Sequence, residues 1–525
     1  MTRRRWAVGG GRRVAWLAAS LALVAGCSHG REYPPDVIVV ALANTPLNFD
    51  PRIGADEASQ KTHQTLYNNL VRIDDELRVV PELAESLTNP DPLTYVATLK
   101  RGVRFHDGSD LTAADVAYTF NSLLAPDFIS AKKGAYRLVE SVRAIDDYTV
   151  EFKLSEPFGS FPINLVLGIV PEGAGPELAR HPIGTGPYRF VSFAADDRVV
   201  LEANPDYYEG APANAGLVLK MVPDDTMRGL ELRKGSVDLV VNDLSPDIIR
   251  TLLDEDRVRV ETAPGVDYAY LGFNLRDPLL QDARLRRAIG FAINREAIVK
   301  YLRRDLARVA TGVVPPLSWA YAEDQLSFAH DPDQARRLLD EAGFPDPDGP
   351  GGQPRLRLTL KTSTSETYRV QAAVIQRDLA EVGIDLELRS MEFATLFADI
   401  IRGNVQLYTL QWVGVTDPDM LRRVFHSAQV PPIGFNRGYY ISADVDALLD
   451  RATRSTDDDE RRALYAEVQR IVARDAPYVG LWYKTNVVVY QPDLAGVTLS
   501  PIGDYTFLQH VHRSSTSTTQ LQQRP

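Results

Sequence analysis

The stretch LRLTLKTSTSETYRVQAAVIQRDLAEVGIDLEL, residues 356–388, carries the clearest structural pattern in the chain. Leucine alternates with polar residues over 356–360, which predicts a strand with one buried face. Apolar residues then recur at helical spacing over 367–382, Gly383 can end that helix, and residues 384–388 alternate again. The pattern predicts a strand–helix–strand unit and therefore an α/β fold.

A second region of the chain predicts the same organisation. Residues 36–42 (DVIVVAL) form a nearly continuous apolar run, which is typical of a strand buried on both faces of a sheet. Residues 217–222 and 237–241 are further apolar strands, and the helix expected over 226–234 ends at Gly235. The chain is also long enough for two or three lobes rather than a single core.

The N-terminus has the features of an export signal. Five arginines and no acidic residue precede the apolar run of residues 14–25, which is shorter than the ~20 residues that a membrane-spanning helix needs. We therefore expect residues 1–26 to be a signal peptide. Leu23-Val24-Ala25-Gly26-Cys27 resembles a bacterial lipobox, whose cysteine receives a lipid, although an ordinary signal peptide with an incidental cysteine is the alternative. The arginine pairs leave general secretion and twin-arginine export both open.

Composition excludes several classes of partner. With 58 basic and 70 acidic residues the chain carries a net charge of −12, and removal of the signal peptide makes the balance more negative. Such a surface repels nucleic acid and anionic membranes. Cys27 is the only cysteine, so no disulfide can form within the chain. Residues 513–525 are rich in Ser, Thr and Gln and are expected to be a disordered tail.

No catalytic constellation is evident. Residues 184–187 (GTGP) lack the third glycine and the lysine of nucleotide-binding loops. Residues 159–162 (GSFP) lack the second glycine of a serine hydrolase elbow. The closest histidine pair, His510 and His512, is better explained as a polar strand edge than as a metal site. We therefore expect no cofactor, no metal site and no enzymatic activity.

Two acid–base candidates have simpler explanations. His106 precedes Asp107-Gly108, a turn dipeptide, and a histidine here can simply hydrogen-bond the turn. Asp417 and Asp419 could be taken for a carboxylate pair, but 70 acidic residues make such pairs common. A secreted hydrolase is therefore the least favoured function.

Residues 99–108 (LKRGVRFHDG) followed by 111–116 (LTAADV) provide the most specific motif. They indicate a strand, a turn at Asp107-Gly108, and a helix with Thr112 as its N-cap and Asp115 as the capping-box partner. This segment resembles the signature of the extracellular solute-binding proteins of family 5, which serve dipeptide, oligopeptide and nickel importers of the ABC type. It is expected to organise a lobe rather than to contact ligand.

Further blocks resemble the same family in the same order over residues 36–510. They are Pro81–Ala84, Gly184–Tyr188, Asn204–Tyr208, Leu271–Asn274, Arg286–Ile289, Ala292–Glu296, Ala335–Leu339 and Leu481–Tyr483. The resemblance implies an α/β fold of the periplasmic-binding-protein-like type II, in which two lobes enclose the ligand by hinge closure and a third lobe packs at the side. It divides the chain into lobe I (27–62, 187–267 and 486–512), lobe II (63–186) and lobe III (268–485).

The resemblance also suggests where ligand binds. Residues 411–419 (QWVGVTDPD) correspond to the ligand-contacting segment of the third lobe, where Trp412 offers a flat apolar face. Peptide-binding relatives place an aspartate three residues after this tryptophan to pair with the ligand's ammonium group. Val415 stands there in this chain, and the shorter spacing is that of the nickel-binding branch. Asp417 or Asp419 could take over the amine pairing.

Two further segments are candidate walls of the site. In residues 436–440 (NRGYY), Asn436 and Tyr440 supply hydrogen-bonding groups, and Arg437 could meet a carboxylate with its bidentate fork. In the first lobe, Asn48 and Asp50 lie in the loop after the opening strand, where open α/β sheets bind ligands.

The functional expectation is an exported receptor, anchored by a lipid on Cys27, facing the periplasm or the cell exterior. It captures a small solute, most simply a di- or oligopeptide, as a monomer, and delivers it to the permease and ATPase subunits of an ABC importer. A nickel chelate, haem or a sugar as ligand, and a role as a ligand sensor, remain alternatives. The protein is not expected to bind nucleic acid.

Overall fold

The computed structural model describes residues 32–349 and 351–514. The predicted signal peptide of residues 1–26 and the predicted lipid attachment residue Cys27 lie outside these residues. Within the described part of the chain, none of the helices has the length and apolar character needed to cross a membrane.

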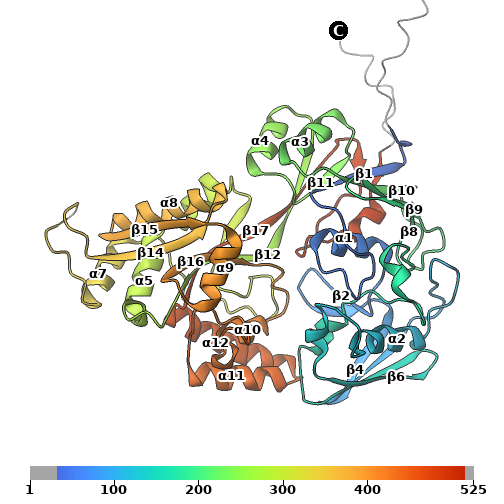
Figure 1. Cartoon of the computed structure of the whole chain (residues 1–525), viewed down its shortest axis with the longest axis horizontal. Coiled ribbons are helices and arrows are strands. Elements are labelled where there is room, and N and C mark those ends of the chain that lie inside the picture. The colour runs from blue at the N-terminus through green and yellow to red at the C-terminus, as the bar shows by residue number, and fades with distance from the viewer. Residues whose placement is uncertain (1–31, 350, 515–525) are drawn as a thin grey trace, which may run out of the picture. The chain divides into compact units, whose positions relative to one another are not determined.

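One large mixed sheet runs through most of the chain (Figure 1). Its strands follow the order β15-β14-β16-β12-β17-β11-β1-β10-β9-β8, and β13 pairs with β17 beside this path. The strands are β1 (Val37–Leu42), β8 (Tyr188–Ala194), β9 (Arg198–Ala203), β10 (Gly216–Met221), β11 (Leu239–Val241), β12 (Arg259–Phe273), β13 (Ala307–Val309), β14 (Leu356–Ser363), β15 (Ile384–Met391), β16 (Leu407–Trp412) and β17 (Tyr478–Tyr490).

Two long antiparallel strands join the two halves of this sheet. β12 and β17 pair from Arg259–Tyr490 to Gly272–Tyr478, with a register shift between Pro264 and Tyr268. One end of β17 also pairs with β11, and the opposite end of β12 pairs with β16. The chain therefore passes between the two halves through two neighbouring strands, β12 and β17.

The first half of the sheet contains the predicted strand–helix–strand unit. β1 lies between β10 and β11 and is parallel to both. Helix α3 (Asp225–Lys234) connects β10 to β11 and ends at Gly235, whose φ of 75° is left-handed and favours glycine. The prediction for this region is confirmed. Two more helices lie in this half, α1 (Glu57–Leu66) and α4 (Pro246–Asp254).

The other half contains the unit first predicted from residues 356–388. β14 and β15 are parallel over eight residue pairs, and α8 (Glu366–Ala380) connects them with Ile375 and Leu379 buried. Gly383 has a φ of 85° and ends the helix as expected. The other helices of this half are α5 (Ala283–Ala292), α6 (Arg295–Ala297), α7 (Pro332–Glu341), α9 (Phe393–Arg402), α10 (Met420–Phe425), α11 (Ala443–Arg454) and α12 (Asp458–Asp475).

A separate antiparallel sheet forms the centre of a third part. Its order is β4-β5-β7-β6, and helix α2 (Ala113–Leu124) begins with the predicted capping box between Thr112 and Asp115. Val116 and Phe120 on that helix are buried. The strands of this sheet are β4 (Ala84–Asp91), β5 (Thr94–Leu99), β6 (Val139–Asp146) and β7 (Thr149–Leu154). A separate two-stranded sheet is formed by β2 (Val71–Ile73) and β3 (Val79–Pro81).

Separate apolar cores follow this division. One cluster draws its buried residues from 70–169, a second from 38–67, 170–241 and 488–511, and two more from 268–483. We call the second group the first lobe, the 70–169 group the second lobe, and the last group the third lobe. The residues at which one lobe gives way to the next stay a prediction.

The C-terminal segment is ordered slightly further than predicted. β19 (His512–Arg513) pairs with β18 (Leu494–Ala495), and Arg513 forms ion pairs with Asp238 and Asp493. These contacts hold a residue that the composition assigned to the disordered tail. Residues 515–525 lie outside the described part.

The strand directions show which edges of the two half-sheets face each other. β17 leaves the third lobe and enters the first, and β11 is antiparallel to it, so the carboxyl ends of β1, β10 and β11 point toward the third lobe. β12 enters the third lobe and β16 is antiparallel to it, so the carboxyl ends of β14, β15 and β16 point toward the first lobe. Ligands of open α/β sheets bind at such carboxyl ends.

Candidate functional site

The loops after β1 and β16 are the two segments that these carboxyl ends bring toward each other. Leu47 in the first loop is 79% exposed and Val413 in the second is 77% exposed. A ligand bound between the facing edges of the two lobes would cover both side chains. Asn48 and Asp50, the polar residues predicted to bind ligand from the loop after β1, contact other protein groups instead.

Asp50 and Asn48 hold the loop after β1 in its conformation. Asp50 is 1% exposed and forms a bidentate ion pair with Arg52, with Nη2 to Oδ2 at 2.7 Å and Nε to Oδ1 at 3.0 Å. The Asn48 side chain accepts a hydrogen bond from the backbone N–H of Asp50 at 2.8 Å. Because Arg52 already neutralises Asp50, this carboxylate is poorly suited to pair with a ligand.

Trp412, the last residue of β16, is packed inside the third lobe. It is 8% exposed and stacks on Tyr270, with ring centroids 6.0 Å apart and planes at 10°. The guanidinium carbon of Arg437 lies 4.3 Å from the Trp412 ring centroid. Arg437 is itself 6% exposed, and aromatic rings rather than a carboxylate surround its charge. Both side chains therefore pack within the third lobe and stabilise this wall of it.

Asn436 and Tyr440 also form internal bonds. Asn436 is 1% exposed, and its Nδ2 donates to the backbone oxygens of His426 and Tyr440. The Tyr440 hydroxyl donates to Asp475 Oδ2 at 2.7 Å. These contacts fix the loop between α10 and α11. They leave Asn436 no free donor toward a ligand.

Asp417 connects the third lobe to the second lobe. The Ser160 hydroxyl donates to Asp417 Oδ1 at 2.8 Å, and Arg461 Nη2 donates to the same hydroxyl at 2.6 Å. The backbone N–H of Gly159 donates to the carbonyl of Thr453 at 2.8 Å. We call these five residues the clasp. Burial raises the pKa of Asp417, and the nearby Arg461 opposes that shift.

Asp419 lies next to the clasp and makes its own local contact. Its Oδ1 accepts a hydrogen bond from the Thr453 hydroxyl at 2.8 Å. Burial raises the pKa of Asp419 to about 6, and the negative charge of Asp417 adds to the shift. The two predicted carboxylates are thus close together, but each is engaged by the protein itself.

Two cavities lie on either side of the clasp, between the second and third lobes. One has a volume of about 380 Å³ and is lined by Gly134, Ala135 and Arg137 of the second lobe and by the loop of residues 414–417 of the third lobe. We call it the inter-lobe cavity. The other, of about 390 Å³, is lined by the β2–β3 region and Trp319. Ser160 and Asp417 belong to both linings. The clasp therefore separates two spaces of ligand-binding size.

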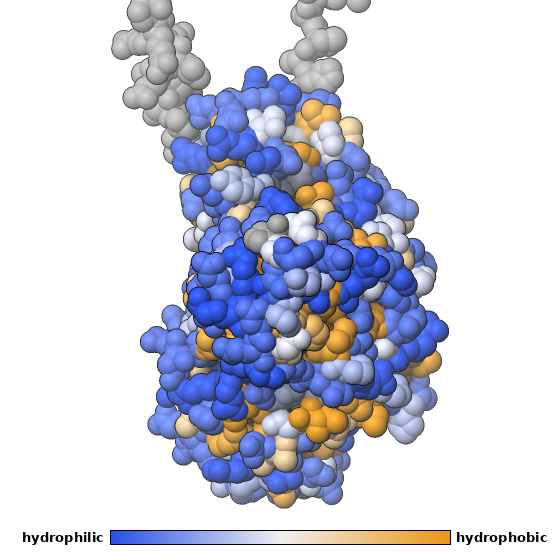
Figure 2. Space-filling view, turned by 90° about the vertical axis from the view of Figure 1, so that its left-hand side faces the viewer, coloured by the Kyte–Doolittle hydropathy of each residue, from blue (hydrophilic) through white to orange (hydrophobic). Residues whose placement is uncertain are grey.

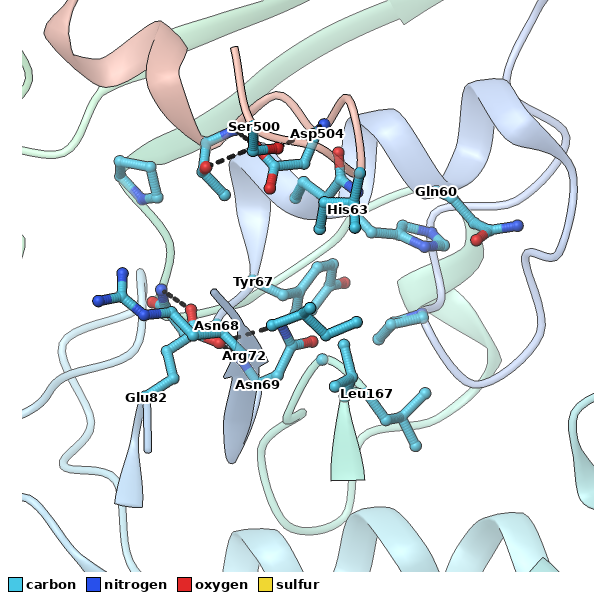
Figure 3. A pocket seen from close by; sticks show the side chains of 18 of the residues that line it. Gln60, His63, Tyr67, Asn68, Asn69, Arg72, Glu82, Leu167, Ser500 and Asp504 are labelled. Atoms are coloured by element: carbon cyan, nitrogen blue, oxygen red, sulfur yellow. Dashed lines mark hydrogen bonds between the residues drawn. The ribbon is translucent and has the colours of Figure 1, made fainter. Parts of the chain in front are cut away.

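A third cavity, of about 460 Å³, lies between the first and second lobes (Figure 3). Buried Glu82 accepts hydrogen bonds from Asn68 Nδ2 at 2.8 Å and from the backbone N–H and Nδ2 of Asn69, both at 3.0 Å. Figure 3 shows this carboxylate with the two amides on one side of the cavity, while His63 and Asp504 lie on another. Burial raises the pKa of Glu82 to about 7.

Sequence reasoning did not find Ser160, Arg461 or Glu82. Ser160 lies in the segment of residues 159–162 (GSFP), which lacks the second glycine of a hydrolase motif. Its partner Asp417 is 257 residues away, so no local pattern could reveal the pair. His106 was expected to bond its own turn. Its Nε2 instead lies 3.1 Å from the carbonyl of Gly186, and its Nδ1 accepts from the Gly184 N–H at 3.2 Å. His106 therefore joins the turn at Asp107-Gly108 to the turn of residues 184–187 (GTGP).

The described residues contain no group of three or more His, Cys, Asp or Glu side chains that could hold a metal ion. Figure 2 shows the side of the molecule that carries α7 and β15, where hydrophilic residues cover most of the surface and small apolar patches lie between them.

Two half-sheets that are joined by two strands and face each other with their carboxyl ends define a solute-binding protein of the type II periplasmic-binding-protein fold. Residues 78–430 match the family described as bacterial extracellular solute-binding proteins, family 5 Middle. This chain belongs to that family. Its members are solute-binding proteins that act outside the cytoplasm.

Curated relatives agree with this assignment. The chain is 30% identical over 500 residues to the oligopeptide-binding protein AppA of Bacillus subtilis, covering 91% of each chain. It is 29% identical over 509 residues to the glutathione-binding protein GsiB of Salmonella choleraesuis, covering 94% of this chain and 97% of that one.

Solved structures agree as well. The structure of Bacillus subtilis AppA in complex with a nonapeptide superposes with a TM-score of 0.71 at 28% identity, covering 91% of this chain and 99% of that one. The structure of Campylobacter jejuni NikZ in complex with Ni(L-His) superposes with a TM-score of 0.75 at 25% identity, covering 92% and 100%.

Proposed function

We propose that this protein captures a small peptide between its first and third lobes and delivers it to the permease and ATPase subunits of an ABC importer. The observation that carries the proposal is the exposure of Leu47 and Val413 on facing strand ends of two lobes joined by β12 and β17. Closure about these strands would cover both side chains with ligand and exclude water. The peptide class is supported by AppA and GsiB, whose names state an oligopeptide and glutathione.

The protein acts without chemistry of its own in this proposal. Asp417, Asp419 and His106, which are the acid–base candidates of the sequence, are engaged by Ser160, Thr453 and the Gly184–Gly186 turn. A receptor needs no group poised to transfer a proton, because it only binds and releases. A sensor that closes on the same ligand and contacts a signalling partner would use the same geometry.

Export and membrane attachment belong to the same proposal. The mature chain would begin at Cys27, carry a lipid on that residue, and act as a monomer at the outer face of the membrane. The peptide would then be captured outside the cytoplasm and handed to the importer at the membrane surface. One acyl chain gives only reversible attachment, so a second lipid signal on the same residue is expected.

A nickel complex is the second candidate ligand. The likeness to NikZ supports it, as does the short spacing between Trp412 and Asp417. The family therefore allows a metal held by its own small chelator rather than by protein ligands alone. Identifying the bound solute as a peptide or as a nickel complex decides between the two candidates.

A thermal shift experiment on the mature protein tests the proposal. Peptides of two to nine residues, nickel–histidine, haem and sugars would be added separately. The true ligand should raise the free energy of unfolding by about 2.7 kcal/mol at a hundredfold excess over the dissociation constant. A shift with nickel–histidine, haem or sugar and none with any peptide would remove the peptide assignment.

A further inference from the structure

Helix α9 of the third lobe carries apolar side chains on two faces. Leu396 and Ile400 are buried in the core of the lobe, whereas Phe393 is 52% exposed. Phe397 lies one turn after Phe393, and the two rings stack with their centroids 6.0 Å apart. A surface helix normally buries one apolar stripe and turns polar residues toward water. The second face of α9 instead presents apolar surface to water.

The exposed rings continue into a neighbouring loop of the same lobe. The guanidinium carbon of Arg437 lies 4.9 Å from the ring centroid of Phe397 and 5.6 Å from that of Phe435. The Phe435 ring also lies against Trp412, with centroids 5.8 Å apart. Ile433, two residues before Phe435, is 79% exposed. We define the apolar patch as Phe393, Phe397, Val413, Ile433 and Phe435.

Strand directions place the apolar patch at the edge of the third lobe that faces the first lobe. Phe393 follows β15 by two residues and Val413 follows β16 by one, and the carboxyl ends of both strands point toward the first lobe. Only β14 separates these two strands in the sheet, so their ends lie about 10 Å apart. Exposed Leu47 lies in the facing loop of the first lobe. The patch therefore lies where the ligand is proposed to bind.

The loops at this place contain no charged side chains. Asp, Glu, Lys and Arg make up 24% of the chain, which predicts about five such residues in a stretch of about twenty. None occurs in residues 43–48 (ANTPLN) of the first lobe or in residues 411–416 (QWVGVT) and 427–435 (SAQVPPIGF) of the third. Both sides of the proposed binding place are therefore uncharged along these loops.

The charged groups nearest to the patch are engaged or covered. Glu392 accepts hydrogen bonds from the backbone N–H groups of residues 394 and 395 at the start of α9. The guanidinium carbon of Arg423 lies 5.8 Å from the ring centroid of Phe435, and its charge interacts with Asp417. Arg437 is covered by the aromatic rings. The patch therefore offers a ligand mainly apolar surface.

Resting on the proposed function, we propose that this protein selects peptides with a bulky apolar side chain, of the size of phenylalanine or leucine, and that this side chain lies on the apolar patch. Contact between two apolar surfaces is favourable because both lose contact with water. Closure of the lobes would bring Leu47 over the same side chain. A carboxylate or ammonium group on the patch would lose its hydration without gaining a partner, so charged side chains are disfavoured there.

Isothermal titration of the mature protein with tripeptides tests this inference. The set contains Ala-Ala-Ala, the three peptides in which one alanine is replaced by phenylalanine, and the three in which the same alanine is replaced by glutamine. The best phenylalanine peptide should bind at least about tenfold more tightly than its glutamine counterpart. Its heat capacity change of binding should also be more negative, because more apolar surface is buried.

Variants of Phe393 test the patch itself. Phe393→Gln should reduce the preference for phenylalanine over glutamine at least about threefold, because it places an amide in the patch. Phe393→Leu should keep most of the preference, since the patch stays apolar. The matched control is Ile129→Gln, which makes a similar change at a residue of the second lobe that is 89% exposed. It should retain the full preference.

The possible outcomes separate this inference from the proposed function. If the glutamine peptides bind as tightly as the phenylalanine peptides, the selectivity is wrong and the peptide receptor stands. The same conclusion follows if Phe393→Gln and Ile129→Gln show equal preference, or if Phe393→Leu loses as much as Phe393→Gln. If no peptide of the set binds, both proposals fall.

Discussion

The Ser160 hydroxyl lies 2.8 Å from Asp417 Oδ1 and joins the second lobe to the third across a sequence separation of 257 residues. Arg461 donates to the same hydroxyl, so one serine contacts both a half-buried carboxylate and a guanidinium that is 5% exposed. This arrangement means that the second lobe is more than a side domain. It takes part in fixing the position of the loop that follows β16.

Ser160→Ala should therefore destabilise the protein. The change leaves Arg461 Nη2 without this acceptor and Asp417 without this donor, at a cost of about 1–3 kcal/mol. Urea unfolding measures the effect. Ser155→Ala is the control, because Ser155 is exposed and makes a single 3.3 Å contact to a carbonyl, and it should change stability by less than about 0.5 kcal/mol. Equal losses would contradict the role of the clasp.

Gly159→Ala should open the clasp by steric conflict. A Cβ at this position would lie 1.9 Å from the carbonyl oxygen of Ser455, a backbone atom that cannot easily move. Gly134→Ala is the matched control, since a Cβ there meets nothing within 4 Å. Hydrogen exchange at the segments around residues 159 and 453 should speed up in the first variant and stay unchanged in the second. Unchanged exchange in both would show that the lobes do not depend on this contact.

Glu82 should make stability fall as the pH rises. Because burial raises its pKa to about 7, the folded protein holds a proton on Glu82 that the unfolded chain releases near its ordinary value. The stabilisation is present below pH ~4.5 and is lost as the pH passes through about 7, for a total of roughly 3 kcal/mol.

Unfolding at pH 5 and pH 8 tests this prediction. Glu82→Gln should remove this part of the pH dependence, whereas Glu76→Gln, at an exposed residue of the same cavity, should keep it. A Glu82→Gln variant with the full wild-type dependence would show that another group is responsible.

Trp412 should prove more important for stability than for ligand affinity. Trp412→Ala removes a buried ring that stacks on Tyr270 and lies against Arg437, and should cost about 3–5 kcal/mol. Trp412→Phe keeps an aromatic face and should cost much less. Thermal unfolding and titration with a bound peptide separate the two effects. If Trp412→Phe retains stability but loses the peptide, direct contact between this ring and the ligand is established instead.

Cys27→Ala should release the protein from membranes. The thiol is the proposed site of lipid attachment, and without it no acyl chain can be added. Fractionation of cells that express the full chain measures the change. Ser28→Ala, next to the cysteine, should leave the protein in the membrane fraction. Membrane retention of the Cys27→Ala protein would exclude anchoring through this residue.

The local structure of this chain could be read from its sequence to a large extent. The alternation over 356–360, the capping box of Thr112 and Asp115, and the helix ends at Gly235 and Gly383 were all confirmed, because each depends on neighbours within a few residues. The fold class followed from the same patterns and from the ordered family blocks, and the family match confirmed it.

The ligand-binding residues stay a prediction. The sequence indicated Asp417 and Asp419, which both line the inter-lobe cavity, but it could not show that Ser160 and Thr453 already bind them. It marked Asp50 as a polar residue near the cleft edge, where Arg52 neutralises it. Hydrogen-bond partners of this kind depend on side chains that only folding brings together.

The sequence by itself determined the strand and helix pattern, the acidic balance and the single cysteine at position 27, since these are properties of composition and short-range spacing. Tertiary structure alone decided which polar groups meet. Ser160 and Asp417 are 257 residues apart in the chain, but their side chains form a hydrogen bond after folding. Whether a charge meets a partner depends on distance in space, because Coulomb and hydrogen-bond energies fall off within a few ångströms in water.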